Sequence, residues 1–202
     1  MITLSIIGVV ASLIIPPLNR QIQDIANETA YKKAYSTLCE AYKMAVKDNE
    51  TGLGAFSGIT ANTNSYTKFR ALKAQLNVMK ECPFDSGALN NCWASSGVGL
   101  KEYTIAGPMQ SFSNKSTTYN QNRNESFVTE NGMFIMLNSL TATTGRDTII
   151  VDTNGEKKPN DWGKDVFLFR MDDTAIGFYS SGVWKHNDGT IVNIAEWTAM
   201  LD

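Results

Sequence analysis

The sequence has few charged side chains and almost no histidine. Charged residues make up 19% of the 202 residues, and His186 is the single histidine. Lysine and arginine are scattered and the net charge is −2, so no basic patch favours nucleic acid or an acidic substrate. His186 lies in the turn WKHNDGT, with no serine, cysteine or aspartate pattern that would predict a catalytic triad. The composition therefore indicates neither an enzyme nor a nucleic-acid-binding protein.

Cysteine is also scarce, with three residues in the chain. Cys82 and Cys92 flank the glycine- and asparagine-rich stretch CPFDSGALNNC. We predict a disulfide that closes this loop, which points to an oxidising compartment. The alternative is two free thiols in a cytosolic loop. Cys39 stands alone in a helical pattern and is expected to be a small buried apolar residue. A zinc site is not predicted, because His186 lies far from the cysteine pair.

The opening segment carries no charge. Met1 to Ile15 reads MITLSIIGVVASLII, and Pro16 and Pro17 follow it. A membrane-spanning helix needs about 20 apolar residues, so this run is short by itself. It also lacks the basic start and the small-residue cleavage site of a secretory signal. Three interpretations stay open from these residues: a buried core helix, a clipped signal peptide, and the end of a membrane helix that starts upstream.

A long amphipathic helix is predicted after the prolines. From Leu18 to Asn49, apolar residues rich in alanine and tyrosine recur every three or four positions, as expected for a helix packed on one sheet. The two prolines at the junction are expected to kink the helix axis. We therefore divide the chain into an apolar half-helix at residues 1–16, an amphipathic half-helix at 17–49, and a globular head at 50–202.

These first 50 residues resemble the type IV pilin and type II secretion pseudopilin family. Its members carry an apolar run with Ile-Ile-Gly and a proline eight residues after the glycine, a pattern that Ile6, Ile7, Gly8 and Pro16 reproduce. The family's leader, cleavage glycine, phenylalanine and glutamate are absent. Aligned on Gly8, the chain starts about six residues inside the family's mature sequence, and restoring them would give about 21 residues, enough to span a bilayer. The run VDTNGEKKPNDWGKDVFLF, residues 151–169, also resembles a stretch common in bacterial pilin-like proteins.

The resemblance implies a structural subunit of a type IV pilus-like or type II secretion pseudopilus filament, serving a pilus or protein secretion. It implies a transmembrane helix in the inner membrane and a periplasmic head, before the subunit joins a periplasmic or extracellular filament. The implied partners are other pilin or pseudopilin subunits, a prepilin peptidase that cuts and N-methylates the precursor, and an assembly platform. A membrane-anchored binding module (minor pilin) that does not polymerise is the alternative. The residues expected to form the membrane and assembly helix are Ile6, Ile7, Gly8, Val9, Val10, Ser12, Leu13 and Pro16.

The rest of the chain predicts a small sheet with two further helices. Helices are expected at residues 65–78 and 194–201, and strands at 126–129, 133–138, 148–152, 166–170 and 175–179. Glu130-Asn131-Gly132 predicts a hairpin turn, so the strands beside it should be antiparallel. The expected fold class is α+β and pilin-like, with a long kinked N-terminal helix packed on a C-terminal antiparallel β-sheet.

The loop that starts at Asp152 offers oxygen ligands for a metal ion. Asp152, Asn154 and Asp165 have spacing compatible with the start of a calcium loop, and calcium is the one cofactor that we consider. The EF-hand pattern is incomplete, because Gly155 comes two positions too early and Gly163 stands where a glutamate should close the site. The alternative is a strand-ending loop in which aspartate and asparagine cap turns. We predict no catalytic residues.

Overall fold

The described chain folds as one long helix against an antiparallel sheet, in the predicted α+β class. The computed structural model describes residues 2–48, 61–82, 125–138, 148–155, 157, 161–179, 190 and 193–199. The helices are α1 (Ile2–Asp48), α2 (Ala61–Ala74) and α4 (Ile194–Ala199). The strands are β1 (Val78–Cys82), β2 (Ser126–Thr129), β3 (Phe134–Asn138), β4 (Thr148–Asp152), β5 (Val166–Met171) and β6 (Ile176–Phe178).

The six strands form one sheet in which each strand pairs with the next in the chain. The order is β1-β2-β3-β4-β5-β6, and every pairing is antiparallel. The predicted hairpin turn joins β2 to β3, and Gly132 adopts a φ of 86°, which glycine tolerates better than other residues. The predicted bounds of β2 and β4 are confirmed. Those of β3 and β5 differ by one residue at one end, and β6 is one residue shorter than predicted at each end.

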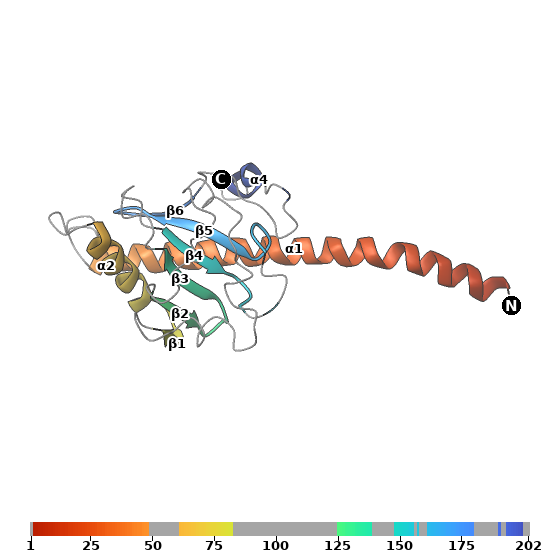
Figure 1. Ribbon diagram of the computed structural model, residues 1–202, viewed down its shortest axis with the longest axis horizontal. Helices are drawn as coiled ribbons and strands as arrows, with labels where there is room; N and C mark the ends of the chain where they lie inside the picture. The colour runs from red at the N-terminus through yellow and green to blue at the C-terminus, as the bar shows by residue number, and fades with distance from the viewer. Residues whose placement is uncertain are drawn as a thin grey trace, which may run out of the picture.

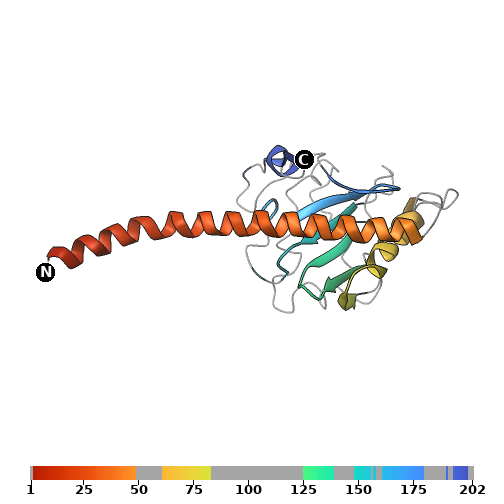
Figure 2. The same cartoon turned by 180° about the vertical axis from the view of Figure 1, so that it is seen from behind.

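Helix α1 crosses one face of the sheet and projects far beyond it at its N-terminal end (Figures 1 and 2). The residues of α1 that are buried against the head recur at intervals of three and four: Tyr31, Ala34, Leu38, Ala41, Tyr42 and Ala45. Tyr31 meets alternate residues of β5, with ring centroids 4.5 Å from Phe167 and 6.0 Å from Phe169. Because side chains alternate between the faces of a strand, Phe167 and Phe169 identify the face of the sheet that α1 covers.

The two predicted half-helices are one continuous helix. Pro16 and Pro17 lie inside α1 and do not interrupt it. Figures 1 and 2 show a gradual bend in the projecting part instead of a sharp kink. Each proline removes one backbone hydrogen bond, and the carbonyl groups released by them lie in a stretch whose side chains are exposed. Water can bond these carbonyls, so the helix continues through the two prolines.

The second helix begins and ends four residues earlier in the structure than the sequence predicted. Helix α2 ends at Ala74, and Val78, expected at the end of that helix, is instead the first residue of β1. Strand β1 pairs with β2, where Val78 is opposite Thr129 and Cys82 is opposite Ser126. Met79, Lys80 and Glu81 are exposed, so this edge strand lacks the alternating apolar pattern by which a strand is recognised in a sequence.

Candidate assembly surface on the long helix

Helix α1 exposes several large apolar side chains before it reaches the head. Their exposed fractions are 71% for Leu13, 56% for Ile14, 53% for Ile15, 50% for Leu18, 56% for Ile22 and 58% for Ile25. Single exposed apolar residues are ordinary, but a contiguous group of them marks an interaction surface. We define Ile14, Leu18, Ile22 and Ile25 as the apolar stripe.

The apolar stripe lies on the side of α1 that is turned away from the sheet. Successive helix residues are about 100° apart, which places the four stripe residues within about 80° of one another. Tyr31, Leu38 and Ala45, which are buried against the head, are centred roughly half a turn away from the stripe. A second molecule can therefore approach the stripe without meeting the head of the first.

Three tyrosines join α1 to the head through hydrogen bonds to backbone carbonyl groups. Tyr31 donates to the carbonyl oxygen of Trp197 at 3.1 Å, Tyr35 to that of Ile176 at 3.5 Å, and Tyr42 to that of Asp172 at 2.6 Å. Burial raises the pKa of Tyr31, so its hydroxyl stays protonated and can donate. Trp197, on α4, also packs edge-on against Tyr31 with ring centroids 4.8 Å apart. These contacts start where the projecting part of α1 ends.

The residues predicted for the membrane and assembly helix are placed only in part. Ser12, Leu13 and Pro16 are exposed on α1, whereas the side chains of Ile6, Ile7, Gly8, Val9 and Val10 lie outside the described residues. The predicted transmembrane helix is wrong: among the residues that the structure describes, no helix is both long and apolar enough to cross a membrane. The physical reason is that Asn19, Arg20 and Gln21 interrupt the apolar character of α1 soon after Ile15.

The predicted calcium ligands come together, but amide groups already occupy most of their oxygens. Asp152 and Asp165 are fully buried. Asp152 Oδ1 accepts hydrogen bonds from the backbone N–H of Asn154 at 3.1 Å and of Gly155 at 2.9 Å. Asp165 accepts from the backbone N–H of Asp161 at 2.7 Å and from Asn154 Nδ2 at 3.0 Å. The carboxylates thus organise the loop as the turn-capping alternative requires.

The metal site itself stays a prediction. Within the described residues, no group of three or more histidine, cysteine, aspartate or glutamate residues is arranged to hold a metal ion. Asn154 Oδ1 is buried and has no hydrogen-bond partner in that part of the chain, so it is one oxygen that a cation could still use. Glu156 and Asn160, which could add ligands, lie outside the described residues.

The structure describes one of the two cysteines of the predicted disulfide. Cys82 is disulfide-bonded and 2% exposed, whereas Cys92 lies outside the described residues, so the pairing stays a prediction. Cys39 carries a free thiol and is half-buried on α1. Its Sγ donates to the carbonyl oxygen of Ile176 at 3.8 Å, and burial raises the pKa of the thiol. The expectation of a fully buried Cys39 is therefore only partly met.

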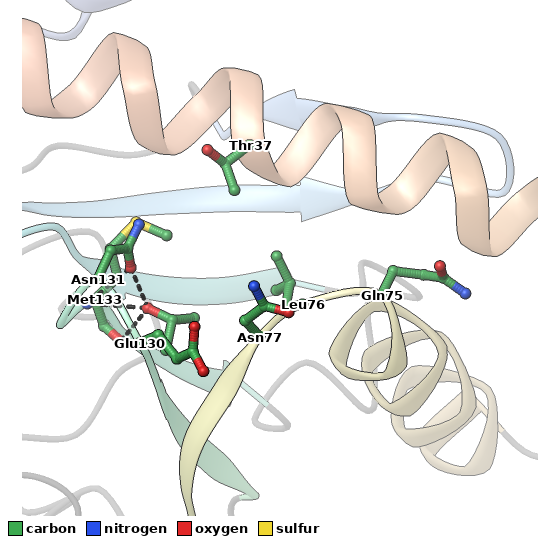
Figure 3. Close-up of a pocket in the computed structure, with 8 residues that line it drawn as sticks. Thr37, Gln75, Leu76, Asn77, Glu130, Asn131 and Met133 are labelled. Carbon is green, nitrogen blue, oxygen red and sulfur yellow. Dashed lines mark hydrogen bonds between the residues drawn. The ribbon is translucent and has the colours of Figure 1, made fainter.

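A cavity of about 280 Å³ opens between α1, the end of α2 and the β2–β3 turn (Figure 3). The residues that line it are mostly uncharged and polar: Thr37, Gln75, Leu76, Asn77, Thr129, Glu130, Asn131 and Met133. Only Glu130 is ionisable, and the hydroxyl of Thr129 accepts a hydrogen bond from the backbone N–H of Met133 at 3.1 Å. These lining residues include no histidine, serine or cysteine.

Comparisons with known protein families, with curated proteins and with solved structures find no match to this chain.

Proposed function

We propose that this chain is a structural subunit of a type IV pilus-like or type II secretion pseudopilus filament, in which α1 joins copies to one another. The observation that carries the proposal is the apolar stripe, which stays exposed on a helix whose other side packs on the head. The resemblance of the opening sequence to the pilin and pseudopilin family supports the same function. No enzymatic activity and no nucleic-acid partner are part of the proposal.

Burial of the apolar stripe would supply the driving force for assembly. Its four side chains are 50–58% exposed, and complete burial of a leucine or isoleucine is worth roughly 1.5–3 kcal/mol. Covering the exposed half of four such side chains would then contribute roughly 3–6 kcal/mol per subunit. Association opposes this gain, because the subunits lose translational and rotational freedom. We therefore expect assembly that depends steeply on concentration.

We propose that the subunit resides at the bacterial inner membrane with its head in the periplasm before it enters the filament. An exposed apolar helix can associate with a lipid surface without crossing it. The proposed partners are other pilin or pseudopilin subunits, with a prepilin peptidase and an assembly platform as the resemblance implies. The predicted disulfide at Cys82 is consistent with an oxidising compartment.

The proposal is tested by comparing the assembly of the purified unmodified chain with that of a variant whose apolar stripe is disrupted. Ile22→Asp places a charge in the middle of the stripe and should keep the protein monomeric at concentrations where the unmodified chain forms filaments. Met79→Asp is the matched control, because Met79 is 64% exposed but lies on β1. Sedimentation velocity and negative-stain electron microscopy would measure the outcome. An unmodified chain that stays monomeric at every concentration, or an assembling Ile22→Asp variant, would contradict the proposal.

A binding module that does not polymerise, such as a minor pilin, is the second candidate. The cavity beside Thr37 and Glu130 favours it, because a polar cavity on the head could accept a small ligand or a loop of a partner. In that case Ile22→Asp would leave binding to the partner unchanged, and the protein would form no filaments.

A further inference from the structure

The chain contains two Asn-Gly steps, and both lie in turns that the structure describes. Asn131-Gly132 is in the turn between β2 and β3 (Figure 3), and Asn154-Gly155 follows β4. Both glycines adopt a positive φ. An asparagine followed by glycine is especially prone to deamidation, because glycine has no side chain to obstruct the attack of its backbone nitrogen on the asparagine amide. The two turns therefore contain the same reactive pair in different surroundings.

Deamidation of such a pair is an intramolecular displacement. The backbone nitrogen of the glycine loses its proton to hydroxide and bonds to Cγ of the asparagine, while negative charge develops on Oδ1. The bond between Cγ and Nδ2 then breaks, the leaving group takes a proton from water and departs as ammonia, and a cyclic imide remains. Water opens either C–N bond of the imide, which gives aspartate or isoaspartate. Hydrogen-bond donors at Oδ1 favour the reaction, whereas a negative charge beside the attacking nitrogen opposes it.

The surroundings of Asn131 favour the reaction. Its Oδ1 accepts a hydrogen bond from the Thr129 hydroxyl at 2.5 Å and a longer one from the backbone N–H of Met133 at 3.5 Å. These donors lie at the oxygen on which negative charge develops, as in an oxyanion hole. The Gly132 N–H donates to the Thr129 carbonyl oxygen at 2.9 Å, which is an uncharged acceptor. Because Asn131 is exposed, water and hydroxide can reach the turn.

The surroundings of Asn154 oppose the reaction. Its Oδ1 is buried and has no hydrogen-bond donor within the described part of the chain, so negative charge on this oxygen would lack stabilisation. Its Nδ2 donates to Asp165 Oδ2 at 3.0 Å, which holds the side-chain amide in place. The Gly155 N–H donates to Asp152 Oδ1 at 2.9 Å, and Asp152 is fully buried. Removing the Gly155 proton would therefore place two negative charges side by side away from water.

We infer that Asn131 is a modification site, at which the folded chain deamidates spontaneously, and that the fold protects Asn154 from the same reaction. The inference is independent of the proposed function, because it concerns the covalent chemistry of two turns on the head. Deamidation would place a second carboxylate beside Glu130 in the lining of the cavity. The isoaspartate product also adds one carbon atom to the main chain of the turn. Since the Thr129 N–H donates to the Met133 carbonyl oxygen at 3.0 Å across this turn, we expect isoaspartate to weaken the β2–β3 hairpin.

The two asparagines serve as controls for each other in one sample. The purified unmodified chain is incubated at pH 8 and digested at acidic pH, where deamidation is slow, and the peptides are mapped by chromatography and mass spectrometry. In the folded chain, Asn131 should deamidate at least about tenfold faster than Asn154, because only its Oδ1 has donors. In urea the two rates should lie within about threefold of each other, because the fold no longer distinguishes the two steps. Equal rates in the folded chain, a faster reaction at Asn154, or no reaction at Asn131 would overturn the inference.

A pair of substitutions tests the part played by the Thr129 hydroxyl. Thr129→Val removes the donor to Asn131 Oδ1 and should slow deamidation at Asn131 about fivefold, the effect of one hydrogen bond. Thr129→Ser keeps the hydroxyl and should react within about twofold of the unmodified chain. Circular dichroism melting and the rate at Asn154 report whether either variant has loosened the fold. A folded Thr129→Val variant that deamidates at Asn131 as fast as the unmodified chain would overturn the role of the hydroxyl. If Thr129→Val does not fold, the comparison of the two asparagines in the unmodified chain still decides the inference.

Discussion

Leu38 and Leu18 lie on the same helix in opposite environments, and replacing each by alanine should separate folding from assembly. Leu38 is fully buried between α1 and the sheet, whereas Leu18 is 50% exposed in the apolar stripe. The two substitutions remove the same atoms from the same type of secondary structure. Any difference between them therefore reports the surroundings of the side chain and not helix propensity.

The magnitudes follow from burial. Truncating a fully buried leucine to alanine removes its transfer free energy and leaves a cavity, so Leu38→Ala should lower the free energy of unfolding by about 3 kcal/mol. For a chain of this size, that corresponds to a fall in Tm of roughly 6–12 °C. Leu18→Ala should change the free energy of unfolding by less than about 0.5 kcal/mol, because its side chain already contacts water. Its effect should appear in assembly instead, as a higher critical concentration.

Thermal unfolding followed by circular dichroism, at a concentration below that of assembly, would measure the first effect. Sedimentation velocity at increasing concentration would measure the second. Equal losses of Tm in the two variants would refute the reasoning, since the projecting part of α1 would then be packed against something in the isolated subunit. A Leu38→Ala variant with unchanged Tm would refute the assignment of Leu38 to the core.

Further predictions concern the side of α1 that packs on the head and two turns of the head. Tyr42→Phe should lower the free energy of unfolding by about 1 kcal/mol in urea titrations, because it removes the 2.6 Å hydrogen bond to the Asp172 carbonyl group; an unchanged unfolding midpoint would contradict this. Gly155→Ala should lower the free energy of unfolding by about 2–3 kcal/mol, since Gly155 has a φ of 68° and an added Cβ would lie 2.5 Å from the Gly132 carbonyl oxygen. Gly132→Ala should lower the free energy of unfolding by only about 1 kcal/mol, because its φ is 86° but the space around it is open. Equal losses in the two variants would show that the close contact between the added Cβ at residue 155 and the Gly132 carbonyl oxygen has no effect on stability. Cys39 should react with iodoacetamide more slowly in the native than in the unfolded chain at pH 8, because burial raises the pKa of its thiol and lowers the thiolate fraction; equal rates by mass spectrometry would show an exposed thiol.

The elements with strong periodic patterns were predictable from the sequence. Apolar residues at intervals of three and four predicted the helix that packs through Tyr31, Leu38 and Tyr42. Strands β2 and β4 were predicted with their observed bounds, because turn residues flank short β-branched or aromatic runs. These are local signals: the residues that carry them are close in sequence, and the pattern follows directly from helix or strand geometry.

Predictions failed where the outcome depends on distant residues. Strand β1 exists because its backbone pairs with β2, some fifty positions later in the chain, and its exposed residues Met79 and Glu81 carry no strand signal. Whether Pro16 and Pro17 kink α1 sharply or leave it continuous depends on whether water can reach the released carbonyl groups. The calcium ligands Asp152 and Asp165 could be paired in the sequence, but only the folded loop shows that backbone amides occupy their oxygens.

The sequence by itself determined a long helix, an antiparallel sheet and an apolar segment at the start of that helix, since each follows from local periodicity and composition. The tertiary structure alone decided which side of α1 the sheet covers, and hence that the apolar stripe remains on the outside. The reason is that a helical pattern places residues on faces but does not say which face finds a partner within the same chain. That choice depends on the side chains of Phe167 and Phe169, more than a hundred positions away, against which Tyr31 packs.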